Sequence, residues 1–217
     1  MNNALNSKIT IQSLQGAYAK HGYTLFSGGS KDFNINIFGV RCAIQDTNTF
    51  NDIVGCAWEY NGTWQLKTYS ATTDPGLYYF ANPMSSKGTH IMVAGQYRGA
   101  YSVGRHQGKY PALVQTGPID FYVDNDRDMV FDRTEIVKNQ YIGANIHTTI
   151  NKSIPDMDTA PLTDYPDVDS TLVKNWSAAC QVFSNPRRFK EFLTIVNKSV
   201  ALYGNKFTYT LFEESSL

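Results

Sequence analysis

The segment IVGCAWEYNGTWQLKTY, residues 53–69, decides the fold class. Two apolar, aromatic-rich runs flank Asn61-Gly62, a dipeptide typical of two-residue hairpin turns because both positions tolerate a positive φ. Upstream, Phe33, Ile35 and Ile37 recur at every second position, which predicts a strand with one buried side. The sequence therefore predicts a domain built mainly from antiparallel strands around this hairpin.

Two helices are expected, one near each end of the chain. Residues 8–20 place apolar side chains on one face before Gly22, a helix stop signal. Near the other end, Asn185 is suited to cap a helix and Pro186 to occupy its first position. Apolar residues then recur along one helical face as far as Gly204.

The remaining pattern consists of short strands separated by turn residues. Further strands are expected at 90–93, 112–115, 119–123, 143–147 and 206–212. Glycines scattered over 95–108 suggest bends or closely approaching backbone. The predicted fold class is mainly β, a β-sandwich or open barrel with a short N-terminal helix and one C-terminal helix. Residues 1–30 form a helix-and-loop extension in this prediction, and residues 31–217 form a single domain.

Composition excludes several function classes. Nineteen basic residues balance nineteen acidic ones, so the chain lacks the basic excess of nucleic-acid-binding proteins. Three widely spaced cysteines fit neither a disulfide framework nor a zinc knuckle. Residues 1–11 lack the basic-then-apolar order of a signal peptide, and no apolar run is long enough to span a membrane. We therefore expect neither nucleic-acid nor membrane partners.

The strongest candidates for chemistry are His147, at the end of a predicted strand, and Cys180, after a run of small residues. A thiol attacks a carbonyl as thiolate and needs a nearby base. Small neighbours let backbone N–H groups approach a developing oxyanion, and Ser177 can add a hydrogen bond. The alternative is a buried structural cysteine and an ordinary strand-end histidine. Cys42 and Cys56 lie in apolar runs, where burial explains them better than catalysis.

A histidine at a strand end, followed after a variable loop by Ser177-x-x-Cys180, resembles the signature of L,D-transpeptidase (YkuD-like) catalytic domains. The segment from Ser70 to Gly76 matches the position of a turn in that family. The resemblance spans residues 33–212 and is closest to divergent bacteriophage variants. The chain departs from the family pattern around the nucleophile, where it has Ala178, Ala179 and Val182.

The resemblance implies a peptidoglycan-processing cysteine enzyme, a phage cell-wall peptidase or endolysin. His147 would generate the Cys180 thiolate, which would attack a stem-peptide carbonyl and form a thioester. The partners would be the bacterial stem peptide and possible phage virion proteins. The chain would be found in the host cytoplasm before lysis or in the virion, and would act at the cell wall. The alternative, supported by the departures, is a non-catalytic virion or wall-binding module on the same fold.

Further residues are candidates for substrate binding. The expected set is His106, Arg105, Trp176, Ala179 and Asn145. Cationic groups near residue 105 suit the carboxylates of a stem peptide. The alternative is a polar strand-and-loop face without a ligand. Trp176 is suited either to stack on a substrate or to pack beneath the cysteine turn.

Residues 124–135 have the oxygen-ligand spacing of a calcium-binding loop. The candidate ligands are Asp124, Asp126, Asp128, Val130 through its carbonyl, Asp132 and Glu135. Met129 replaces the usual glycine, and no helix precedes the loop. The alternative is a solvated acidic turn paired with its own arginines. A bound Ca²⁺ would be structural, and no organic cofactor is expected.

Residues 151–169 contain three prolines among polar and acidic residues, which predicts a long loop. Loops of this length are often functional lids. We expect removal of this loop to leave the core almost unaffected.

Overall fold

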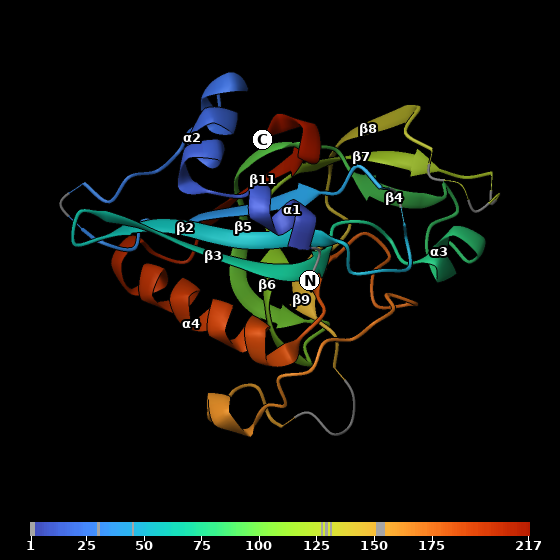
Figure 1. Ribbon diagram of the computed structural model, residues 1–217. Coiled ribbons are helices and arrows are strands. Elements are labelled where there is room, and N and C mark those ends of the chain that lie inside the picture. Colours follow the sequence, from blue (N-terminus) through green and yellow to red (C-terminus); the bar gives the residue numbers. More distant parts are fainter. Residues whose placement is uncertain are drawn as a thin grey trace.

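The chain folds as a closed β-barrel with a three-stranded sheet beside it (Figure 1). The computed structural model describes residues 3–29, 31–44, 46–126, 128, 130, 132–150 and 155–217. The barrel strands follow the order β1-β11-β5-β6-β9-β10-β3-β2, and the second sheet has the order β4-β7-β8. The expected mainly β class with short helices is confirmed, and the barrel closes completely.

The elements have the following bounds. The barrel strands are β1 (Asn36–Arg41), β2 (Asp52–Tyr60), β3 (Thr63–Thr72), β5 (Gly95–His106), β6 (Tyr110–Gln115), β9 (Ile146–Thr148), β10 (Gln181–Phe183) and β11 (Phe207–Glu213). The second sheet contains β4 (Thr89–Met92), β7 (Ile119–Asp124) and β8 (Glu135–Gln140). The helices are α1 (Asn3–Lys8), α2 (Ile11–Lys20), α3 (Leu77–Ala81) and α4 (Pro186–Tyr203), with 3₁₀ turns η1 (Leu162–Asp164) and η2 (Glu214–Ser216).

The predicted hairpin is confirmed as β2 and β3. Tyr60 pairs with Thr63 across the two-residue turn. Asn61 and Gly62 have φ values of 50° and 71°, as a hairpin turn of the I′ type requires. This long hairpin supplies two adjacent strands of the barrel wall.

The predicted late helix is confirmed as α4, which runs along one side of the barrel (Figure 1). The Asn185 side chain accepts hydrogen bonds from the first backbone N–H groups of the helix. Phe189 and Phe192 pack on Phe183 of β10, with ring centroids 5.0 and 5.1 Å apart. Burial of a phenylalanine side chain contributes about 2 kcal/mol, so this cluster anchors the helix to β10.

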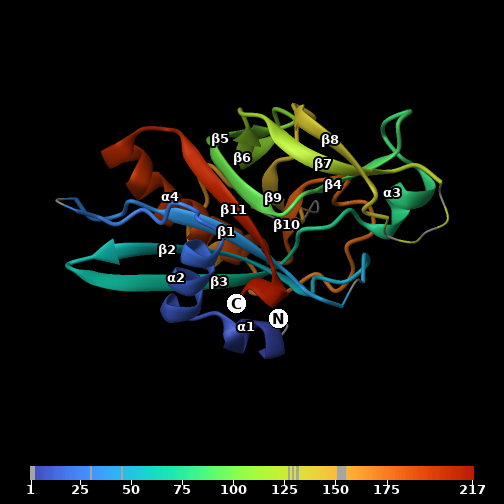
Figure 2. The ribbon, with the colours of Figure 1, turned by 90° about the horizontal axis from the view of Figure 1, so that it is seen from above.

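The predicted N-terminal helix is confirmed as α2, which begins three residues later than expected, and a further short helix, α1, precedes it. The side chains of Thr10 and Ser13 form a capping box that sets the start of α2. Figure 2 shows both helices on the outer side of the barrel wall. Tyr18 of α2 contacts Phe212 of β11 edge-on, with ring centroids 5.1 Å apart. The extension therefore buries apolar surface against the barrel.

The glycine-rich stretch forms β5, the longest strand in the described part of the chain, so of the two interpretations offered for its glycines, bends is the wrong one. Close backbone approach was the better interpretation. A Cβ on Gly104 would lie 2.7 Å from a methyl group of Val114 on the neighbouring strand. Gly99 has a φ of 60° beside an irregular register between β5 and β11. These glycines let β5 pair closely with both neighbours.

The proline-rich segment is attached to the core, and the expectation that it can be removed without effect is wrong. Met157 and Tyr165 are buried within the main hydrophobic cluster, and Tyr165 is only 1% exposed. The Lys190 side chain of α4 donates to the Met157 carbonyl at 2.6 Å. Residues 151–154, also part of this segment, lie outside the described residues.

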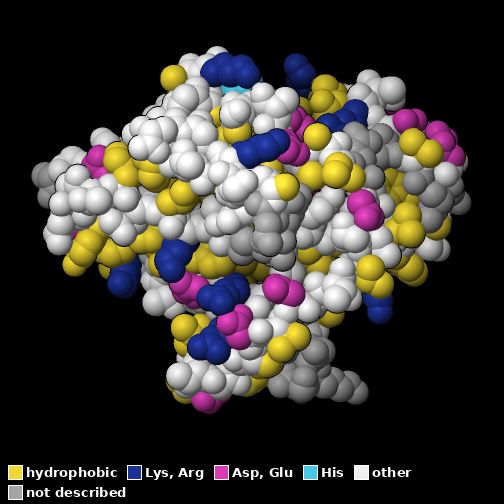
Figure 3. All heavy atoms as spheres, viewed as in Figure 1, with side chains coloured by type: hydrophobic (Ala, Val, Ile, Leu, Met, Phe, Trp, Pro, Cys, Tyr) yellow, Lys and Arg dark blue, Asp and Glu magenta, His cyan; other side chains and the backbone are white. Residues whose placement is uncertain are grey.

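The surface carries charges of both signs. On the face seen in Figure 3, basic and acidic side chains are interspersed rather than gathered into one patch. None of the helices in the described ranges combines the length and the apolar composition that a membrane span needs.

We predict that Tyr165→Ala lowers the free energy of unfolding by about 3 kcal/mol, because it leaves a cavity beside the barrel core. Leu162→Ala is the matched control within the same segment, since Leu162 is 37% exposed. Urea unfolding of the two variants measures the difference. Equal, small effects would show that the segment contributes little to the core.

Candidate active site

Parallel pairing of β9 and β10 brings the two predicted catalytic residues together. His147 lies opposite Val182 in this pair, and Gln181 lies opposite Ile146. The Gln181 N–H donates to the Asn145 carbonyl at 2.9 Å, one residue before β9 begins. Cys180 directly precedes β10, so this register places its side chain beside His147.

A second histidine completes the cluster. Sγ of Cys180 and one ring nitrogen each of His147 and His106 all lie within 4.8 Å of one another. His106 ends β5, and its ring stacks on that of His147 with centroids 4.1 Å apart and an interplanar angle of 25°. Three segments that are distant in sequence therefore supply the reactive groups.

The cluster faces a cavity of about 770 Å³. This volume suits a small organic or peptidic ligand. Several sequence-predicted residues line it, and so do residues that the sequence gave no reason to select. The lining includes Cys180, His147, His106, Asn145, Trp176, Tyr79, Tyr110 and Lys109.

The hydrogen bonds of His147 leave one ring nitrogen with a lone pair. Its Nδ1 lies 3.0 Å from the Thr148 carbonyl and 3.1 Å from the hydroxyl of Tyr110. A carbonyl only accepts, so Nδ1 carries the proton in that contact and Nε2 keeps its lone pair. Nε2 is buried and has no hydrogen-bond partner among the described residues. This nitrogen is therefore available to a proton donor in the cavity.

Burial keeps both partners neutral at rest. Desolvation, followed by the neighbouring His106, lowers the pKa of His147 to about 3. Desolvation raises the pKa of the Cys180 thiol to about 11. Sγ makes a weak contact, 3.7 Å long, with the Gly143 carbonyl, and a hydrogen bond with the backbone of Asn145 offsets only part of the rise in the thiol pKa. The resting site is therefore a thiol and a neutral imidazole, not a thiolate–imidazolium pair.

Ser177 shapes the cysteine turn and does not enter the cavity. Its fully buried hydroxyl donates to the Cys180 carbonyl at 2.7 Å. Its own carbonyl accepts from the N–H of Gly76 at 2.8 Å. The turn that contains Gly76, which resembled a family turn in sequence, therefore holds the cysteine turn in place through the Ser177 carbonyl.

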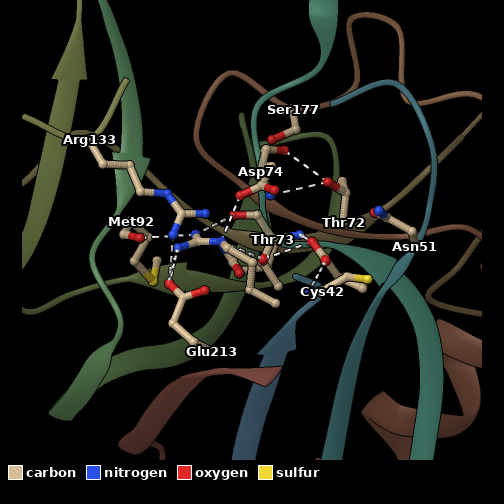
Figure 4. A network of polar contacts seen from close by, with 12 residues as sticks. Cys42, Asn51, Thr72, Thr73, Asp74, Met92, Arg133, Ser177 and Glu213 are labelled. Carbon is tan, nitrogen blue, oxygen red and sulfur yellow. Dashed lines mark hydrogen bonds and ion pairs between the residues drawn. The ribbon is translucent and has the colours of Figure 1, made fainter. Parts of the chain in front are cut away.

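A buried ion network fixes that supporting turn (Figure 4). Nε of the fully buried Arg41 lies 2.7 Å from a carboxylate oxygen of Asp74, two residues before Gly76. The same guanidinium contacts Glu213 of β11 at 3.2 Å and donates to the Met92 carbonyl at 2.9 Å. Removing one partner of such a network typically costs about 3–5 kcal/mol.

Two of the predicted substrate-binding residues lie outside this cavity. Arg105 points to the proline-rich segment and forms an ion pair of 2.7 Å with Asp158. Ala179 is 7% exposed and packs in the main hydrophobic cluster. His106, Asn145 and Trp176 do line the cavity. Arg105 thus has a tethering role for the segment that borders the site.

The acidic turn is held by its own backbone. Asp126, Asp128 and Asp124 accept backbone N–H groups of residues 128, 130 and 132, respectively. Glu135 begins β8 opposite Val123. Arg127, Met129 and Phe131 lie outside the described residues. Among the described residues, His106, His147 and Cys180 are the side chains that lie close enough together to share a metal ion. The carboxylates of the acidic turn do not form such a group there, so Ca²⁺ binding by the turn stays a prediction.

The other two cysteines are buried away from this cavity, as their apolar surroundings in sequence suggested. Tyr110 and Gly143 are the neighbours that sequence reasoning missed. Tyr110 starts β6 after the turn that links β5 to β6, and no local sequence signal marks it as a partner of His147. Its role follows from the pairing of β6 with β9, the strand that contains His147.

Comparisons with protein-family models, curated proteins and solved structures returned no match. The chemistry assigned to this site therefore rests on its own geometry and on the motif resemblance.

We predict that alkylation of Cys180 by iodoacetamide accelerates continuously as the pH rises from 6 to 10, without a plateau near neutrality. The raised pKa of about 11 keeps the thiolate fraction small and rising throughout this range. Mass spectrometry of the Cys180 peptide gives the rate, and the urea-unfolded chain, with an ordinary thiol pKa of about 8.5, is the control. A plateau below pH 7 would instead reveal a preformed thiolate–imidazolium pair.

Proposed function

We propose that the protein is a peptidoglycan-processing cysteine enzyme of L,D-transpeptidase-like type, which acts on the stem peptide through a thioester on Cys180. The observation that carries this proposal is that a ring nitrogen of His147 lies within 4.8 Å of the Cys180 Sγ in one cavity, while the buried Nε2 of this ring has no hydrogen-bond partner among the described residues. A free lone pair beside a thiol is what general-base activation of a nucleophile requires.

The residues support a two-step acyl transfer. His147 Nε2 takes the thiol proton as Sγ bonds to the substrate carbonyl carbon, and the carbonyl electron pair moves to oxygen. Collapse of this intermediate breaks the C–N bond, and His147 returns the proton to the leaving amine. Water, or an acceptor amine, then attacks the thioester, with His147 again taking and returning a proton. The contact of Nδ1 with the Thr148 carbonyl supports the positive charge on the ring in each step.

Neutrality at rest is compatible with this mechanism. A base with a low pKa holds its lone pair at neutral pH, and the proton transfer is coupled to carbon–sulfur bond formation instead of preceding it. The binding of substrate in the cavity would also displace water and strengthen the electrostatic contacts inside.

The stem peptide is proposed as substrate from the motif resemblance together with the lining of the cavity. Lys109 provides a cationic group suited to a peptide carboxylate, and Trp176 provides an aromatic face. Because the motif is most similar to bacteriophage variants of the family, and a phage gains from opening the cell wall, we favour hydrolysis over cross-link formation. The protein would then act at the bacterial wall, after lysis begins or from within a virion.

A second candidate is a non-catalytic virion or wall-binding module. The burial of Cys180 and its raised thiol pKa favour this alternative, because reactive cysteines usually have lowered pKa values. Ala178, Ala179 and Val182 also depart from the family pattern. A module of this kind would retain stem peptides in the cavity without changing them.

We predict that the purified protein releases new muropeptides, or exchanges terminal residues, when it is incubated with peptidoglycan. Cys180→Ala should abolish these products and His147→Ala should reduce them by at least about 100-fold, because each removes a partner of the proton transfer. Mass spectrometry of the muropeptides, with and without Ca²⁺, measures both effects.

Cys42→Ala is the matched control, because it removes a buried cysteine elsewhere in the fold. It should leave the products unchanged. Unchanged peptidoglycan from several wall types, with a folded protein that still binds the wall, would support the non-catalytic module.

A further inference from the structure

The side-chain amide of Asn145 is fixed in one orientation. Its Oδ1 accepts a hydrogen bond from the backbone N–H of Gln115 at 2.9 Å. A backbone N–H only donates, so the oxygen and not the nitrogen of the amide must face it. Nδ2 then lies 3.0 Å from Nδ1 of His106. Asn145 therefore donates a hydrogen bond to this ring nitrogen.

This contact sets the tautomer of His106. Burial, together with the nearby Lys109, lowers the pKa of His106, so its ring is neutral at neutral pH. A neutral imidazole has one N–H group. Because Nδ1 accepts from Asn145, the proton of His106 is on Nε2. His106 thus offers an N–H donor, whereas His147 offers a lone pair.

The same contact bears on metal binding. A metal ion held by Cys180 and both histidines would need a lone pair on the ring nitrogen of His106 that faces it. Asn145 occupies the lone pair on Nδ1, and Nε2 carries the proton. The fixed amide therefore favours a hydrogen-bonding role for His106 over a ligand role.

We infer that His106 is a second catalytic residue, whose Nε2–H binds the oxygen that becomes negative when Cys180 attacks an acyl group. Asn145 is its positioning residue. This inference rests on the proposed cysteine chemistry. The oxygen of the attacked carbonyl is two bonds from sulfur, and an effective donor lies about 3 Å from that oxygen. The ring of His106 lines the same cavity as Cys180, and one of its two ring nitrogens lies within 4.8 Å of Sγ. We infer that the Nε2–H group points toward the position of the attacked oxygen.

The step is balanced within the site. The thiol proton passes to Nε2 of His147, the carbon–sulfur bond forms, and the carbonyl π pair becomes the oxyanion lone pair. His106 keeps its proton and shares it with the oxyanion as a hydrogen bond. When the leaving group departs, the lone pair re-forms the carbonyl and the hydrogen bond weakens. A neutral donor is suited to this role because it does not compete with His147 for the thiol proton.

Two electrophilic reagents that modify the same thiol by different routes test this inference. Iodoacetamide alkylates sulfur without forming an oxyanion, whereas p-nitrophenyl acetate acylates it through one. His106→Phe keeps an aromatic ring to stack on His147 but has no N–H group. We expect this variant to be acylated about 100-fold more slowly at Cys180, with little change in its alkylation rate. Subtraction of the Cys180→Ala background isolates this thiol.

His106→Gln is the matched control, because a glutamine amide can place an N–H group near the position of Nε2. It should recover most of the lost acylation rate. If His106→Phe slows both reactions equally, or slows neither, the oxyanion role is overturned while the cysteine chemistry stands. If wild-type Cys180 is alkylated but not acylated, the proposed function itself fails, and the role of His106 fails with it.

Imidazole ¹⁵N NMR of the wild-type protein tests the structural basis independently of any reaction. We expect the Nε2–H tautomer for His106 and the Nδ1–H tautomer for His147 at neutral pH. Asn145→Ala should release His106 into a tautomer mixture. An Nδ1–H tautomer of His106 in the wild type would overturn the assignment.

Discussion

The short parallel pair formed by β9 and β10 is the contact on which both the barrel and the site depend. Each strand has only three residues, yet together they join β6 to β3 and close the barrel. So short a ladder holds few hydrogen bonds, and its stability comes from packing around it. Phe183 of β10 supplies much of this packing through its contacts with α4. The helix thus stabilises the register that sets Cys180 beside His147.

A second set of contacts holds the cysteine turn from the opposite side. The buried Arg41 fixes Asp74, the chain continues to Gly76, and Gly76 binds the Ser177 carbonyl. The hydroxyl of Ser177 then binds the Cys180 carbonyl. The fully buried Arg41 thereby positions Cys180, the proposed nucleophile, through a chain of intermediate contacts. Rigid support of this kind is what a preorganised site needs, because small displacements of reacting groups cost large factors in rate.

Locally encoded features were predictable from the sequence, and features that depend on long-range pairing were not. The Asn61-Gly62 hairpin and the capped helix after Asn185 are specified by neighbouring residues, and both are confirmed. The glycine-rich β5 was not predicted, because its glycines are required by closely approaching neighbours. His147 and Cys180 were paired by a motif, and the fold brings them together. The opposite tautomers of the two histidines depend on contacts across four segments, which no sequence pattern encodes.

In the proposed mechanism, Cys180 carries a substrate acyl group during turnover. Acid quenching of a reaction with soluble stem-peptide muropeptides, followed by intact-protein mass spectrometry, tests it most directly. We expect a protein adduct equal in mass to the muropeptide acyl fragment, located on the Cys180 peptide and removed by hydroxylamine. Formation of the same muropeptide products by the Cys180→Ala variant, with no adduct on the wild-type protein, would contradict it.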